Sequence, residues 1–166
     1  MNRTTIIGIA AAVFLFGGIV WFARPSPPGG NTASPIPGGG GSLTADAASF
    51  DFGRISMAAG NVSHVFTIRN TGAEPVVIGK VYTSCMCTTA ALTKGGKRFG
   101  PYGMPGHGLT SGINESVNPN EEATVEVIFD PAAHGPAGVG RIQRAVIIEQ
   151  SAGQPLELGV TALVTP

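Results

Sequence analysis

Residues 62–72 read VSHVFTIRNTG, and this stretch decides the fold class. The side chains at every second position are apolar or aromatic, so they line one face of an extended strand: Val62, His64, Phe66 and Ile68. The strand pattern ends at Asn70-Thr71-Gly72, residue types that favour a turn. This alternation is typical of a sheet protein.

The same alternation returns later in the chain. Residues 125–129, 142–148 and 156–164 have the period-two pattern of further strands, and Asp130-Pro131 ends the first of these. No stretch beyond residue 43 keeps a helical period for three turns. Six to eight short strands separated by Gly, Pro, Asn and Asp turns predict an immunoglobulin-like β-sandwich domain over residues 43–166.

Residues 4–23, TTIIGIAAAVFLFGGIVWFA, carry no charge and lie between Arg3 and Arg24. Twenty helical residues span roughly 30 Å, the thickness of the hydrocarbon core of a bilayer. A cleaved signal peptide is the alternative, but Trp21 stands where a cleavage site needs a small residue. We therefore expect residues 1–24 to form an uncleaved N-terminal transmembrane signal anchor, with the lipid bilayer as partner of residues 4–23.

Residues 25–42 hold five Pro and six Gly, which neither a helix nor a sheet accommodates. This composition predicts a disordered Pro/Gly-rich linker between the anchor and the domain. The segment that precedes the apolar run is short and carries Arg3, so we place it in the cytoplasm. The expected localisation is the cell membrane, crossed once, with the soluble domain outside the cytoplasm.

Composition excludes several classes of function. Ten Lys and Arg balance ten Asp and Glu, so the net charge of zero argues against nucleic acid, which binds to clustered basic side chains. The sequence has no nucleophile elbow, phosphate-binding loop, dinucleotide fingerprint or His-Glu-x-x-His motif. We therefore expect no catalytic and no organic cofactor-binding residues, and we expect that the protein is not an enzyme.

Several segments of the predicted sandwich occur in the order known from a bacterial family. They are Phe50-Asp51-Phe52-Gly53, His64-Val65-Phe66, Arg69-Asn70-Thr71-Gly72, Pro75-Val76-Val77-Ile78, Ser84-Cys85-Met86-Cys87-Thr88 and Phe129-Asp130-Pro131. With this ordered set, roughly residues 48–164 resemble the family of domain of unknown function 1573. The resemblance implies an immunoglobulin-like, Hydin-related fold in an exported, membrane-tethered protein. It implies no activity, because the family has none assigned.

The sequence departs from this family pattern at two places. Met86 stands where the family has Gly between the cysteines. A Gly-rich stretch also separates the cysteines from Pro119-Asn120-Glu121, where the family has Pro-Gly-Glu. Asn tolerates the left-handed backbone that the family's Gly provides, so we expect the turn to persist.

Cys85 and Cys87 are the candidate reactive residues and the chain's only cysteines. In an extended strand their side chains share one face, with Cα atoms about 6.6 Å apart, so a direct disulfide would bend the strand. Two thiolates on one face could instead hold a metal ion. Met104 and His107, in the Gly-rich residues 94–112, would complete a copper or zinc site. Burial of both sulfurs in the core, with no metal or other cofactor, is the structural alternative.

Two functional hypotheses follow from these patterns. The first is a membrane-anchored, non-enzymatic binding or structural module of the cell envelope that offers loops or an edge strand to an envelope protein. The alternative is a Cu(I)-binding or thiol-redox protein that uses the Cys-x-Cys motif at Cys85 and Cys87. The position of the cysteine side chains, either near His107 or in the core, separates the two.

Overall fold

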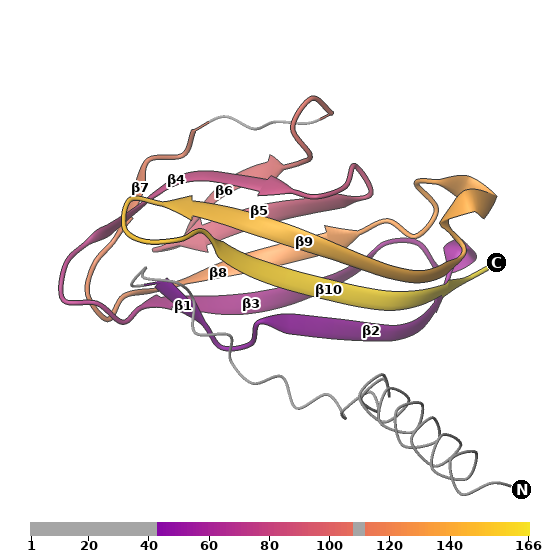
Figure 1. Ribbon diagram of the computed structural model, residues 1–166, viewed down its shortest axis with the longest axis horizontal. Helices are drawn as coiled ribbons and strands as arrows, with labels where there is room; N and C mark the ends of the chain where they lie inside the picture. Colours follow the sequence, from indigo (N-terminus) through magenta and orange to yellow (C-terminus); the bar gives the residue numbers. More distant parts are fainter. Residues whose placement is uncertain (1–42, 108–111) are drawn as a thin grey trace, which may run out of the picture. The chain divides into compact units, whose positions relative to one another are not determined.

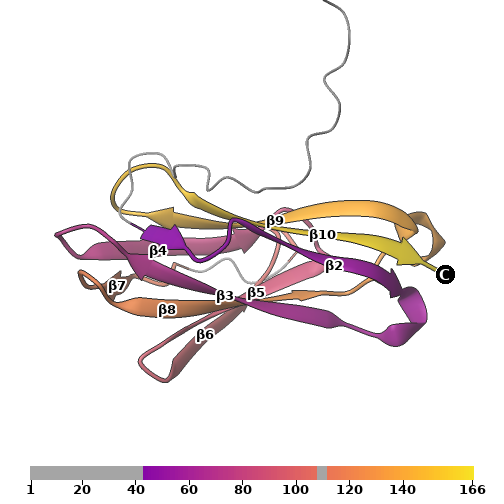
Figure 2. The same cartoon turned by 90° about the horizontal axis from the view of Figure 1, so that it is seen from below.

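The computed structural model describes residues 43–107 and 112–166. These residues form two five-stranded sheets, which face each other as the layers of a β-sandwich (Figure 1, Figure 2). The prediction of an all-β fold is therefore confirmed. The predicted anchor at residues 1–24 and the predicted linker at residues 25–42 lie outside the described residues. Among the residues that are described, no helix has the length and apolar character that crossing a bilayer requires.

The first sheet has the strand order β1-β3-β8-β5-β6, and neighbouring strands are antiparallel. In that order, its strands span Leu43–Ala45, Val62–Asn70, Glu122–Phe129, Thr88–Lys94 and Lys97–Tyr102. The predicted strand at residues 62–70 is β3, which pairs with β8 so that Phe66 lies opposite Val125. Both residues are fully buried, as the period-two pattern predicts.

The second sheet has the strand order β2-β10-β9-β4-β7. In that order, its strands span Ser49–Ser56, Leu156–Thr165, Gly140–Gln150, Val76–Thr83 and Glu115–Val117. β2 runs parallel to β10, and the other pairs are antiparallel. Two short 3-10 helices, η1 (Met57–Ala59) and η2 (Gly135–Gly138), precede β3 and β9.

The described residues hold ten strands, more than the six to eight expected from the sequence. β1 and β7 are only three residues long, too short to show a period of two. β6 lies inside residues 94–112, which sequence reasoning treated as a Gly-rich stretch without a strand. Gly95 and Gly96 have φ angles of 55° and 80°, so they form a tight turn that returns the chain beside β5 as a hairpin.

The inward faces of both sheets meet in one large apolar cluster. Its buried members are Leu43, Phe66, Ile68, Val76, Ile78, Val81, Ala90, Leu92, Tyr102, Val117, Ala123, Val125, Val127, Val146, Ile148, Leu158 and Val160. Full burial of a Val, Leu, Ile or Phe side chain contributes about 1.5–3 kcal/mol relative to exposure. We call this set the main core, and it is the principal stabilising element of the sandwich.

A second, smaller apolar cluster contains both cysteines. Its buried members are Cys85, Cys87, Phe129, Ile142, Ala162 and Val164. Half-buried side chains pack around it, among them Met57 and Ala133. We call this set the cysteine cluster. It brings the connection between β4 and β5 into contact with residues of β8, β9 and β10.

The turn predicted at Pro119-Asn120-Glu121 is confirmed. Asn120 has a φ of 62°, the left-handed conformation that Asn tolerates. The Glu121 N–H donates to the Asn118 carbonyl at 3.0 Å, which closes the turn. The Asn70 N–H donates to the carbonyl of Glu121, and the Asn120 N–H donates to the carbonyl of Asn70, so this turn is fixed against the end of β3.

Candidate functional site

Cys85 and Cys87 lie in the connection from β4, in one sheet, to β5, in the other. The chain forms a turn here and is not extended. The Thr88 N–H donates to the Cys85 carbonyl at 3.1 Å, which closes this turn and brings the two cysteine Cα atoms to 5.3 Å. The sulfurs form a disulfide. The structure thus bends the chain in the way that sequence reasoning required for a direct disulfide, in place of a flat strand with two parallel thiols.

Backbone hydrogen bonds hold the cysteine turn in place independently of its sulfurs. The Ser84 N–H donates to the Ala145 carbonyl, and the Ala145 N–H donates to Ser84 Oγ, both at 2.9 Å. The Asp130 N–H donates to the Cys87 carbonyl at 2.8 Å. The turn is therefore tied to β9 on one side and to the segment after β8 on the other.

The sulfurs are buried but lie close to the surface. Cys87 is 3% exposed and Cys85 is 9% exposed, whereas Met86 between them is 52% exposed. The Cys87 N–H donates to Cys85 Sγ at 3.3 Å. Burial agrees with the structural alternative from the sequence, that the cysteines are core residues. Polar side chains at both sulfurs distinguish them from ordinary core sulfur.

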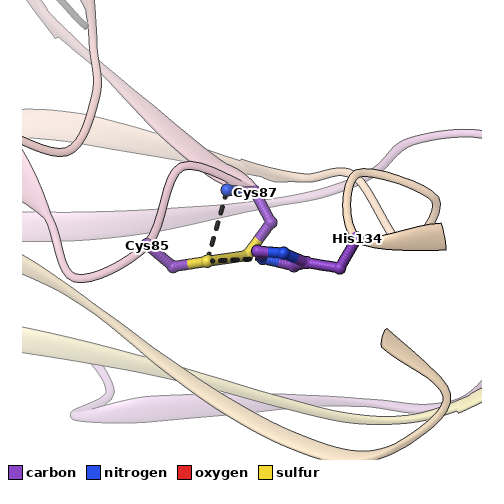
Figure 3. Close-up of side chains that lie close together, drawn as sticks. All are labelled: Cys85, Cys87 and His134. Carbon is purple, nitrogen blue, oxygen red and sulfur yellow. Dashed lines mark hydrogen bonds between the residues drawn. A yellow bond between two sulfur atoms is a disulfide. The ribbon is translucent and has the colours of Figure 1, made fainter. Parts of the chain in front are cut away.

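His134 contacts the disulfide from a distant part of the sequence. Its Nε2 lies 3.2 Å from Cys85 Sγ (Figure 3). A disulfide sulfur carries no hydrogen, so Cys85 Sγ can only accept, from the tautomer that has its proton on Nε2. β8 ends at Phe129, and Asp130 Oδ1 accepts the N–H of Ala132 at 2.8 Å, which turns the chain toward η2. The exposed ring of His134 precedes η2. This contact joins residues 49 apart in sequence, so no local motif could reveal it.

Arg144 contacts the other sulfur. Its Nε donates to Cys87 Sγ at 3.2 Å, and its Nη1 donates to the Gln143 carbonyl at 2.8 Å. The hydroxyl of Thr88 lies 3.7 Å from the same sulfur. Arg144 shares the period-two face of β9 with the buried Ile142 and Val146. A charged residue at an inward position is a signal that sequence reasoning did not use.

The ligand atoms of Cys85, Cys87 and His134 all lie within 4.8 Å of one another. Two ligands that each reach about 2.3 Å to one ion are at most about 4.6 Å apart, so small side-chain shifts would place all three atoms around one ion once the disulfide is reduced. Among the described residues, this is the group of His, Cys, Asp and Glu side chains that could hold an ion, and His107 lies outside it.

The structure shows no contact between the cysteines and the other two predicted ligands among the described residues. The His107 N–H donates to the Met104 carbonyl at 3.0 Å, so these two residues belong to one turn. Met104 is half-buried and His107 is exposed. Residues 108–111, which follow them, lie outside the described residues. A role for Met104 or His107 in a metal site stays a prediction.

The basic residues of the β5–β6 hairpin are used within the domain. Lys94 Nζ lies 2.9 Å from Glu115 Oε1 and 3.4 Å from Glu121 Oε1, and Arg98 lies 2.8 Å from Glu126 Oε2. The hydrogen bond to Glu115 raises the pKa of Lys94. The backbone N–H of Asn118 and the nearby Lys94 lower the pKa of Glu121. Lys94, Glu115 and Glu121 therefore form one ion-pair group, and Arg98 pairs separately with Glu126. The cysteine turn remains the candidate site.

His64 occupies the position that its sequence neighbours predict. Its ring stacks on Phe50 with centroids 3.7 Å apart and meets Phe66 edge-on at 4.6 Å. The residue is half-buried. It is part of the packing between β2 and β3 and is distinct from the cysteine turn.

The segment that contains both cysteines matches a known protein family. Residues 43–100 match the family described as "Protein of unknown function (DUF1573)". Over these residues, the chain is similar to the DUF1573 family. The DUF1573 segment contains β1 to β5 and both cysteines, and the predicted resemblance is confirmed there. His134 and Arg144 follow later in the chain, so the site combines the DUF1573 segment with side chains from outside it.

Solved structures with a similar fold have low sequence identity to this chain. A protein of unknown function from Porphyromonas gingivalis W83 aligns with a TM-score of 0.55 and 17% identity over 74% of this chain. That alignment covers 46% of the Porphyromonas chain, so the present chain spans less than half of that relative. At this identity, the likeness concerns the fold alone.

Two further structures align more weakly. A PapD-like domain of human CEP192 has a TM-score of 0.45 and 14% identity, covering 86% of this chain and 94% of that one. The secreted serine protease VesC from Vibrio cholerae has a TM-score of 0.49 and 14% identity, covering 75% of this chain and 24% of that one. No curated protein matches the chain.

Proposed function

We propose that this chain is a non-enzymatic, immunoglobulin-like binding module of the cell envelope, and that its ligand is a soft metal ion held by Cys85, Cys87 and His134. The single observation that supports this function is the approach of these three ligand atoms to within 4.8 Å of one another. The ligands come from two distant segments that backbone hydrogen bonds already fix, so little chain ordering is needed on binding.

The chemistry of the three ligands favours Cu(I). Thiolate sulfur is a soft ligand and imidazole is intermediate, whereas magnesium and calcium prefer oxygen. Zinc accepts the same ligands but takes four in its structural sites, and the group has three. The cysteines bind as thiolates, so the disulfide is first reduced. Copper or zinc binding through Met104 and His107 as additional ligands remains the version predicted from the sequence.

A competition assay tests the ligand set. The full chain in mild detergent, reduced and kept without oxygen, is titrated with Cu(I) against a chromogenic Cu(I) chelator. We expect one high-affinity ion per chain, lost in the Cys85→Ser, Cys87→Ser double variant. His134→Gln should weaken binding at least about tenfold, because losing even an outer-shell partner of a metal ligand costs 10–100-fold. His107→Gln is the matched control and should leave the affinity unchanged.

Two results would count against this function. Equal Cu(I) affinity of the wild-type chain and the double Ser variant removes the metal site altogether. Weaker binding in His107→Gln together with unchanged binding in His134→Gln replaces the ligand set by the one predicted from the sequence.

We also propose that residues 1–24 anchor the chain in the cell membrane, that residues 25–42 act as a flexible linker, and that the domain lies outside the cytoplasm. The uncharged run at residues 4–23 supports the anchor. The disulfide supports the location, because disulfides persist mainly in oxidising compartments outside the cytoplasm. Reporter fusions after residue 45 test the orientation. If a reporter that works in the cytoplasm is active and a reporter that works only after export is silent, the proposed orientation is wrong.

A further inference from the structure

The two sulfurs of the disulfide have different surroundings. Cys87 is more deeply buried than Cys85, and its Sγ accepts a hydrogen bond from Arg144 Nε at 3.2 Å. Cys85 Sγ faces the exposed ring of His134, next to the exposed Met86. A guanidinium stays protonated in proteins, so Arg144 makes a charge-assisted hydrogen bond whenever Cys87 becomes negative. The site is therefore asymmetric with respect to thiolate formation.

We propose that this disulfide undergoes thiol–disulfide exchange with an exported dithiol, in which the incoming thiolate attacks Cys85 and Arg144 holds Cys87 as the leaving thiolate. The partner is identified by its chemistry alone, as a protein or small molecule with two thiols. This proposal goes beyond metal binding, since the exchange needs no ion.

The exchange proceeds through two successive thiolate attacks. In the first, the thiolate of the partner attacks Cys85 Sγ, a partner–Cys85 disulfide forms, and the Cys85–Cys87 bond breaks with its electron pair on Cys87 Sγ. In the second, the other thiolate of the partner attacks its own sulfur in the mixed disulfide, and Cys85 leaves as a thiolate. The partner is oxidised to a disulfide by two electrons, and the domain is reduced by the same two.

The side chains around the sulfurs match these steps. Arg144 and the Thr88 hydroxyl, 3.7 Å away, lie at the sulfur that leaves first. His134 Nε2 lies 3.2 Å from the sulfur that leaves second, within hydrogen-bond distance of the departing thiolate. Leaving groups that are stabilised as thiolates depart faster. Arg144 and His134 thus each contact one reacting sulfur.

The position of the disulfide favours a chemical role over a stabilising one. The cysteines are two residues apart, so the bond closes a loop of only three residues. A loop of that length restricts the unfolded chain far less than a long loop does. The hydrogen bonds of Ser84 and of the Cys87 carbonyl to their neighbours do not involve sulfur, so the turn keeps its anchors when the bond opens.

Trapping the mixed disulfide tests the direction of attack. The oxidised full chain, in mild detergent with a metal chelator, is treated with glutathione and iodoacetamide together, and peptide mass spectrometry locates each group. We expect glutathione on Cys85 and the alkyl group on Cys87. Glutathione mainly on Cys87, or shared equally by both cysteines, overturns the proposal.

Reduction kinetics test the role of Arg144. We expect Arg144→Gln to slow reduction by glutathione about tenfold, within the range that a hydrogen bond to a charged group supplies. Arg141→Gln removes the same charge from an exposed position of the same strand and should change the rate less than about twofold. Arg144→Lys should recover part of the loss, because it restores a cationic donor.

Two kinetic results contradict the proposal. Equal rates for the Arg144→Gln and Arg141→Gln variants remove Arg144 from the exchange. A reduction rate equal to the rate of global unfolding, measured on the same chain, shows that the native disulfide does not react. Because no copper is present, these outcomes are independent of the Cu(I) titration. Exchange without copper binding, or copper binding without exchange, separates the two proposals.

Discussion

The main core and the cysteine cluster are built from the same two sheets but differ in what they place inside. The main core consists of apolar side chains and one Tyr, and all of its members are buried. The cysteine cluster places a disulfide among apolar side chains and then adds His134 and Arg144 at its sulfurs. The first region only needs to exclude water. The second keeps polar, reactive groups at the border of the core, which a purely stabilising cluster does not need.

The largest expected effect lies in the main core. Phe66 is fully buried, and Phe66→Ala should lower the free energy of unfolding by about 3–5 kcal/mol, because it leaves a cavity. Urea denaturation followed by circular dichroism measures the loss. Phe50→Ala, at a residue 36% exposed, is the matched control and should cost clearly less. Equal losses would show that the main core is not the principal stabilising region.

Asn70 is a fully buried polar residue of the sandwich. Its buried Nδ2 donates to the carbonyls of Glu74 and Val117, each at 2.8 Å, and its Oδ1 accepts the N–H of Gly72 at 2.9 Å. Asn70→Ala leaves these backbone groups unpaired and should cost about 2–3 kcal/mol. Urea denaturation measures this loss as well. Asn118→Ala, at an exposed position, should cost less than half as much, and an equal cost would contradict this account.

The disulfide should contribute less to stability than either of these residues. Chain entropy for a closed loop of three residues gives about 1.6 kcal/mol, against about 3 kcal/mol for a 15-residue loop. The Cys85→Ala, Cys87→Ala variant should therefore unfold at a slightly lower urea concentration, with an unchanged dependence on urea. A loss as large as that of Phe66→Ala would make the disulfide a structural staple and remove the contrast between the two regions.

The smallest expected effect is the acid response of the ion-pair group. The pKa of Glu121 lies below its ordinary value of 4.5, because the Asn118 N–H donates to it and Lys94 lies nearby. The stability that this carboxylate contributes is complete above pH 4.5 and is lost as the pH falls through the lowered folded-state pKa. Glu121→Gln should therefore reduce the dependence of the thermal unfolding midpoint on pH over that range.

The neighbouring carboxylate provides the control for that pH series. The Glu122 side chain is 60% exposed and lies 4.0 Å from Arg69, so Glu122→Gln should leave the acid dependence close to that of the wild-type chain. If both variants respond alike, the hydrogen bonds around Glu121 have no part in the acid response.

The strands of the sandwich were predictable because burial on one face imposes a period of two. Residues 62–70, 125–129 and 156–164 show it clearly, and each lies in a strand of the structure. β6 was missed, because Gly100 and Pro101 interrupt its pattern and its pairing depends on the turn at Gly95-Gly96. Short strands of this kind are fixed by their neighbours in the sheet more than by their own composition.

The candidate site was predictable only in part. Cys85 and Cys87 were identified from their spacing, and the structure joins them. His134 was not identified, because its contact to Cys85 joins residues 49 apart in sequence and arises from the fold, with no local spacing to reveal it. Arg144 was detectable in principle, as a charge at an inward position between Ile142 and Val146. Contacts across sheets depend on tertiary packing, which the sequence pattern does not show.

X-ray absorption at the copper edge of the reduced, Cu(I)-loaded chain tests the account most directly, because it reports the atoms bound to the ion. We predict two sulfur ligands and one nitrogen ligand in the wild-type chain, with the nitrogen absent in His134→Gln and retained in His107→Gln. A nitrogen that persists in His134→Gln, or a third sulfur that disappears in Met104→Leu, would contradict the assignment of the site to Cys85, Cys87 and His134.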